Sequence, residues 1–130
     1  MLKLLLRGAV ATLGMLATSA AAEDWLYFGT AANGTTFHYD ADSIRRSPEG
    51  TRSWVRVDLS YRTASHSETM LLWIVRCADR TQAITEIIDY AANGRVIRRT
   101  RLKPSEVMFS PPTPGPGSIG VALHEAVCGD

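Results

Sequence analysis

Two successive strand-like runs constrain the fold of this chain more than any other feature of its sequence. From Thr51 to Tyr61, apolar and polar residues alternate as on a strand with one buried face, and Tyr61 falls on the apolar side. From Met70 to Ala78, both sets of alternating positions are apolar, which is typical of a central strand covered on both faces. Together, these two runs predict a sheet in which further strands flank them and a second layer packs against one face.

Shorter segments supply the other strands. Residues 24–29 and 35–39 flank the pair Asn33-Gly34, whose tolerance of positive φ is typical of a hairpin turn. Residues 84–90 and 95–101 show further strand patterns, and the second segment is basic enough to suit an exposed edge.

One helix is predicted at the C-terminal end. Ser118 is a suitable N-cap, apolar residues recur at helical spacing from Ile119 to Val127, and Gly129 ends the pattern. His124 falls outside the main apolar stripe, so we expect it to be solvated. The predicted fold class is α+β, with a single antiparallel sheet of about six strands packed by one C-terminal helix.

The start of the chain has the composition of an export signal. A short basic beginning, an uncharged apolar stretch and the small residues Ala20–Ala22 predict a signal peptide over residues 1–22 and a domain over residues 23–130. The uncharged stretch is shorter than the roughly 20 residues that a membrane span needs. Because no cysteine lies near the cleavage point, we expect a periplasmic or secreted domain without a lipid anchor or a membrane span.

Charge and motif content narrow the classes of function. The chain has 130 residues with 14 Lys+Arg and 13 Asp+Glu, a net charge of +1. A dedicated nucleic-acid binder carries a marked basic excess, so nucleic acid is not an expected partner. The sequence contains no GxSxG, no HExxH and no phosphate-cradling glycine loop. We therefore predict a non-catalytic protein without cofactor or metal.

Cys77 and Cys128 are the two cysteines of the chain. An even number of cysteines in an exported domain usually means pairing, and this bond would tie the end of the central strand to the end of the helix. A reactive thiol or a zinc site is the alternative. Neither cysteine belongs to a CxxC pair, and the three histidines are scattered along the chain, so the disulfide is favoured.

Several short motifs occur together in an order that resembles a known family. They are Trp25, Tyr39-Asp40-x-x-Ser43-Ile44, Cys77-x-x-Arg80, Tyr90-x-x-x-Gly94-x-Val96, Pro116-x-Ser118 and Val127-Cys128. This order is similar to that of the surface-adhesin protein E-like domain of Gram-negative bacteria, over nearly all of the predicted domain. The resemblance implies the same sheet, helix and disulfide. It also implies a binding role, toward a host matrix or serum protein or an envelope component.

A basic run is the densest charge feature and the first candidate binding site. It consists of Arg95, Arg98, Arg99, Arg101 and Lys103, and strand alternation places all but Arg98 on one face. An anionic partner would bind such a face. The alternative, which we favour, is a solvated edge strand whose cations pair with acidic residues of the same domain.

A second candidate is a patch of Arg52, Trp54 and Arg56 on the polar face of the first strand run. Most aromatic residues of a small sheet domain build its core, and Trp54 is the one that we expect to be exposed.

Two further functions stay open at the level of sequence. A small exported domain with a disulfide can inhibit a cell-wall enzyme such as lysozyme, for which Ser105–Gly117 is the candidate loop. A small-molecule carrier needs a pocket, which sequence patterns do not reveal. The oligomeric state is not predicted.

Overall fold

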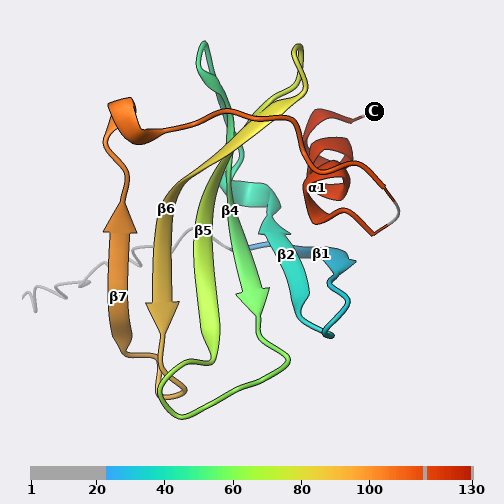
Figure 1. Ribbon diagram of the computed structural model, residues 1–130. Helices are drawn as coiled ribbons and strands as arrows, with labels where there is room; N and C mark the ends of the chain where they lie inside the picture. The colour runs from blue at the N-terminus through green and yellow to red at the C-terminus, as the bar shows by residue number, and fades with distance from the viewer. Residues whose placement is uncertain (1–22, 116, 130) are drawn as a thin grey trace, which may run out of the picture.

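The computed structural model describes residues 23–115 and 117–129. The predicted signal peptide over residues 1–22 lies outside the described residues, so its cleavage stays a prediction. The described chain forms one antiparallel sheet with one helix packed on it (Figure 1), as the sequence pattern predicts.

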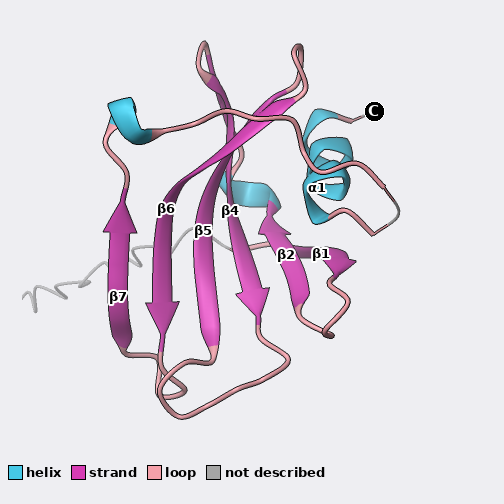
Figure 2. Ribbon diagram, viewed as in Figure 1, coloured by secondary structure: helices cyan, strands magenta, loops and turns pink. Residues whose placement is uncertain are grey.

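The sheet has seven strands, six of which follow the order β1-β2-β4-β5-β6-β7. The short strand β3 pairs with β4 outside this path, and it is the one strand that the sequence pattern does not indicate. The strands are β1 (Trp25–Thr30), β2 (Thr36–Asp40), β3 (Arg45–Ser47), β4 (Gly50–Asp58), β5 (Glu68–Arg76), β6 (Thr81–Tyr90) and β7 (Val96–Arg101). Two single-turn 3₁₀ helices, η1 (Ala41–Ser43) and η2 (Pro104–Glu106), lie in the connections, as Figure 2 shows.

Helix α1 (Ile119–Cys128) packs on one face of the sheet, at the β1–β2–β4 end (Figure 1). Val55 and Val75 from the central strands meet Leu123 and Val127 of α1, and all four side chains are buried. The helix begins at Ser118, whose hydroxyl accepts a hydrogen bond from a backbone amide, and it ends at a glycine with positive φ, as the sequence predicts.

The predicted disulfide between Cys77 and Cys128 is present. It ties the chain just after β5 to the last residue of α1, and it closes a loop with a sequence separation of 51 residues. A covalent link over that length restricts the unfolded chain and so stabilises the packing of helix on sheet.

Two side chains lie where the sequence pattern does not place them. Tyr61 is 88% exposed, because β4 ends at Asp58 and the alternation that predicts its burial stops there. His124 is buried, not solvated: it lies one helical turn before Cys128, and its Nδ1 is 3.9 Å from the Sγ atom. The buried surface of α1 is therefore wider than its apolar stripe.

The segment between β7 and α1 crosses the end of the sheet (Figure 1). At Ser110 it pairs with Gln82 of β6 through two backbone hydrogen bonds of 2.9 and 3.0 Å. Val107 and Phe109 line the face of the sheet away from α1, whereas Met108 and the residues just after Ser110 line the helix side. One segment thus forms walls on both faces.

Candidate binding surfaces

Strand β7 is an edge of the sheet and carries part of the predicted basic run. All of its residues are exposed, and within the described chain it pairs only with β6. Arg98, Arg99 and Arg101 belong to the strand, whereas Arg95 precedes it and Lys103 follows it at the start of η2. The structure therefore brings three of the five cations together on one strand.

The arginines of β7 divide between the two faces of the sheet. Arg99 and Arg101 lie on the face away from α1, where their guanidinium nitrogens are 3.7 and 3.5 Å from Glu86 Oε1. Arg98 lies on the opposite face and binds Asp89 at 3.0 Å. These contacts show the pairing that the favoured alternative predicts, and they leave much of each guanidinium group in solvent.

The expected alignment of four cations on one face applies to Arg99 and Arg101 alone. Arg95 lies in the turn before β7, beyond a register shift near the end of β6. Lys103 lies beyond the strand, where the chain turns into η2. Because strand alternation holds only inside a regular ladder, it does not align these two residues with the others.

Asp89 joins the edge strand to a polar cluster on the α1 face. Thr69 Oγ1 donates to Asp89 Oδ1 at 2.8 Å, Arg98 donates to Oδ2, and His66 Nε2 lies 3.2 Å from Oδ1. Burial by itself raises the pKa of Asp89. The hydrogen bonds from Thr69 and Arg98 and the charges of His66 and Arg98 outweigh this effect of burial. The pKa of Asp89 therefore lies below its ordinary value.

The second predicted patch lies on the face away from α1, which we call the open face. Arg52, Trp54 and Arg56 share this face of β4, but their contacts differ. Arg52 binds Glu49 at 2.7 Å, whereas Arg56 lies over the ring of Trp25, 5.0 Å from its centre. Trp54 is half-buried, so it is not the exposed aromatic that we expect from the sequence.

An acidic pair occupies the open face near β2. Asp58 and Glu68 are opposite each other on β4 and β5. Arg56 Nε donates to Asp58 Oδ2 at 3.2 Å, and His38 Nδ1 lies 3.4 Å from the same oxygen. Burial, followed by the charge of Asp58, raises the pKa of Glu68. This corner therefore holds one carboxylate paired with Arg56 and a second that ionises less readily.

A groove of about 650 Å³ lies on the open face, beside the crossing segment. Leu72 and Ile74 of β5 form its floor, and Val107 and Phe109 of the crossing segment form a wall. Arginine side chains stand at its rim, among them Arg76, which stacks on Phe109 with its guanidinium carbon 3.6 Å from the ring centre.

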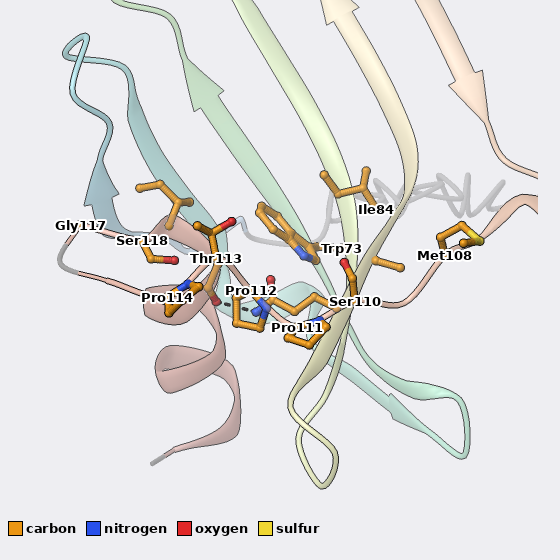
Figure 3. A pocket seen from close by; sticks show the side chains of 14 residues that line it. Trp73, Ile84, Met108, Ser110, Pro111, Pro112, Thr113, Pro114, Gly117 and Ser118 are labelled. Atoms are coloured by element: carbon orange, nitrogen blue, oxygen red, sulfur yellow. Dashed lines mark hydrogen bonds between the residues drawn. The ribbon is translucent and has the colours of Figure 1, made fainter.

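A second cavity, of about 620 Å³, lies on the α1 side (Figure 3). Trp73 and Ile84 of the sheet line it together with the proline-rich part of the crossing segment. Gln82 Nε2 donates to the carbonyl of Gly120 at 2.5 Å and so joins β6 to the first turn of α1. The described residues that line this cavity are all uncharged.

Sequence patterns do not reveal either cavity, because each has a wall from the crossing segment. The position of that segment follows from its pairing with Gln82, a contact between residues far apart in sequence. The one available signal is the apolar character of both faces of β5, which predicts that something covers Leu72 as well as Trp73.

The fold and these surfaces define a small α+β domain, tied by a disulfide, whose exposed features are a cationic sheet edge and two cavities. Within the described residues, no helix is long and apolar enough to cross a membrane.

The family model described as surface-adhesin protein E matches residues 25–129, which is nearly all of the described chain. The chain belongs to this family, as its motifs suggest. Comparisons with curated proteins and with solved structures return no match.

Proposed function

We propose that this chain is an exported, non-catalytic binding protein that holds an acidic, extended segment of a partner protein along β7. Its family is described as one of surface adhesins, which supports a binding role. The single observation that carries the proposal is the exposed edge strand β7, which has three arginines and, among the described strands, a neighbour on one side only.

The backbone of β7 offers hydrogen-bonding groups to such a segment. Leu102 N donates to Thr85 O at 2.9 Å, and Arg101 and Arg99 are the partners of Glu86 and Ile88 in the same register. Inward and outward groups alternate along an antiparallel strand. The amide and carbonyl groups of Arg99 and Arg101 therefore point away from β6, where an added strand would pair with them.

The charge of this edge favours an acidic partner. Arg99 and Arg101 share the single carboxylate of Glu86, so that pairing leaves a positive excess on the open face. Val96 and Ile97, each 45% exposed, add apolar surface at the start of the strand. A second copy of the chain would bring arginines against arginines, so the edge favours a different protein.

Export through the inner membrane completes the proposal. The predicted signal peptide over residues 1–22 and the disulfide both fit an oxidising compartment outside the cytoplasm. A periplasmic or secreted domain without a lipid anchor would meet envelope components or host matrix and serum proteins.

The inhibitor alternative depends on a loop that reaches into an enzyme cleft. The described part of the candidate segment instead crosses the end of the sheet and pairs with Gln82 at Ser110. This arrangement favours a structural role for the segment over insertion into another protein.

Two variants at one position test the edge. Arg99→Gln and Arg99→Pro remove the same charge, but only proline also removes the outward amide, a change that an edge strand tolerates. We expect Arg99→Pro to weaken binding of a synthetic peptide of alternating glutamate and valine by about tenfold more than Arg99→Gln does. Arg46→Gln, at an exposed arginine of β3, is the charge control.

Equal binding by the two Arg99 variants would contradict strand addition. If both variants bind the peptide equally weakly, and their affinity for heparin falls by the same factor, the edge is a general anion site instead. The retained near-UV circular dichroism of each variant is the check on folding.

A further inference from the structure

The open-face groove has a feature that the edge proposal does not use: its two ends differ in how their arginines are paired. At one end, Arg52 Nη2 donates to Glu49 Oε2 at 2.7 Å, and Arg76 Nε donates to the Glu49 carbonyl oxygen at 3.1 Å. One glutamate thus anchors two arginines. Since Arg76 forms no ion pair with a carboxylate within residues 23–115 and 117–129, this end keeps a positive excess.

At the same end of the groove, one donor atom of Arg52 has no hydrogen-bond acceptor among the described residues. This atom, Nε, is buried. Because this atom has almost no accessible surface, a ligand would bind the outer Nη groups of the guanidinium instead. A ligand oxygen at the Arg52 and Arg76 end would lie among N–H donors that form forks suited to a carboxylate.

The middle of the groove is apolar. Leu72 and Ile74 form the floor, and Val107 and Phe109 form one side. The wall is fixed in place, because Arg76 stacks on Phe109 and Ser110 pairs with β6 through its backbone. A preformed apolar wall lowers the cost of ordering when a flexible chain binds.

At the far end, near Leu102, the arginine already has a carboxylate partner, unlike Arg76. Arg101 lies at this end and is 3.5 Å from Glu86. The groove therefore runs from a cationic end through an apolar middle, and its volume of about 650 Å³ is in the range of small-molecule sites.

We propose that this groove binds a free single-chain fatty acid. The carboxylate lies between Arg52 and Arg76, and the alkyl chain follows Leu72 and Val107 toward Leu102. The uncharged cavity on the α1 side offers no cation to such a head group, so the anion selects the open-face groove. This inference goes beyond the proposed function at β7 and does not depend on it.

Isothermal titration of the exported protein with dodecanoate, kept below its micelle concentration, tests the proposal. We expect saturable binding at one site, and binding of dodecyltrimethylammonium, which has the same chain with a cationic head, weaker by at least about tenfold. Butyrate, which has the head without the chain, is expected to bind too weakly to detect.

Variants locate the site. Arg76→Gln is expected to weaken dodecanoate binding by about tenfold, and Arg76→Lys, which keeps the charge, by less. Arg46→Gln removes a charge from the other face of the sheet and should leave the affinity unchanged. Arg52→Gln is also expected to weaken dodecanoate binding. Because this variant keeps the stack of Arg76 on Phe109, its weaker binding would not come from a loosened wall.

Four results would overturn the proposal. They are no dodecanoate binding by the unaltered protein up to about 1 mM, equal affinity for the cationic amphiphile, equal losses in Arg46→Gln and Arg52→Gln, and binding to phosphatidylglycerol vesicles without binding to dodecanoate. The edge variants at Arg99 are measured separately, so failure at one site is distinguishable from failure at the other.

Discussion

The two faces of the sheet are made by the same strands, yet they carry different side chains. On the α1 face, Val55 and Val75 are almost fully buried and pack with Leu123 under the helix. On the open face, Arg52 and Arg76 stand at the rim of a groove with an apolar floor. Strand alternation thus assigns stability mainly to one face and leaves the other available for binding, and the following variants test that division.

Loss of the disulfide is expected to have the largest effect. The double substitution Cys77→Ser with Cys128→Ser frees a loop with a sequence separation of 51 residues, and the chain-entropy estimate for that loop is about 4 kcal/mol. Urea unfolding of the oxidised protein and the variant measures the difference in the free energy of unfolding. A difference below about 1 kcal/mol would mean that the bond does not restrict the unfolded chain in this way.

A matched pair of truncations compares the two faces directly. Leu123→Ala, at a residue with no exposed surface, is expected to cost about 3 kcal/mol of unfolding free energy, and Leu72→Ala on the half-exposed open face about 1 kcal/mol. Thermal and urea unfolding give both values. Equal costs would show that the open face supports the fold as much as the α1 face does.

Substitution of Asp89 is expected to have a smaller, pH-dependent effect. Asp89→Asn removes the carboxylate that binds Thr69 and Arg98, at a cost of about 1 to 2 kcal/mol at neutral pH. Since the pKa of Asp89 in the folded protein lies below its ordinary value of 3.8, the stability it contributes is present above that pH and is lost as the pH falls through the folded value.

The stability difference between the Asp89→Asn variant and the unaltered protein should therefore shrink in acid. Urea unfolding at about pH 7 and about pH 3 measures it. A difference that stays constant over this range would contradict a lowered pKa for Asp89.

Substitution of Glu68 is expected to have the smallest effect, and of opposite sign. The pKa of Glu68 is raised above its ordinary value of 4.5, so its protonated form stabilises the fold and that contribution is lost as the pH rises through the folded value. Glu68→Gln should raise the free energy of unfolding by a few tenths of a kcal/mol at neutral pH, a small value because solvent screens this site. In acid it should leave the free energy of unfolding unchanged. A loss of stability at neutral pH would point instead to a favourable ion pair.

The sequence predicts those parts of the molecule that depend on local patterns. The alternation in β4, the apolar run in β5, and the caps of α1 at Ser118 and Gly129 all appear as expected. The bond between Cys77 and Cys128 follows from its place at the ends of strand and helix. Each of these features is set by neighbouring residues or by a simple period.

Contacts between distant segments account for what the sequence does not predict. The groove exists because Ser110 pairs with Gln82 and directs Phe109 toward Arg76. His124 is buried beside the disulfide that ties the end of α1 to the chain after β5. Neither result follows from a periodic pattern, since both depend on where separate elements meet.

The outward amides of Arg99 and Arg101 provide the most direct test that binding takes place on the uncovered part of the sheet. Hydrogen exchange at these amides, measured by NMR with and without the alternating glutamate–valine peptide, reports whether a new strand pairs with β7. We expect exchange at both amides to slow by at least about tenfold on binding, while that at Leu102, which already donates to Thr85, changes little. Bound peptide with unchanged exchange at Arg99 and Arg101 would contradict strand addition at this edge.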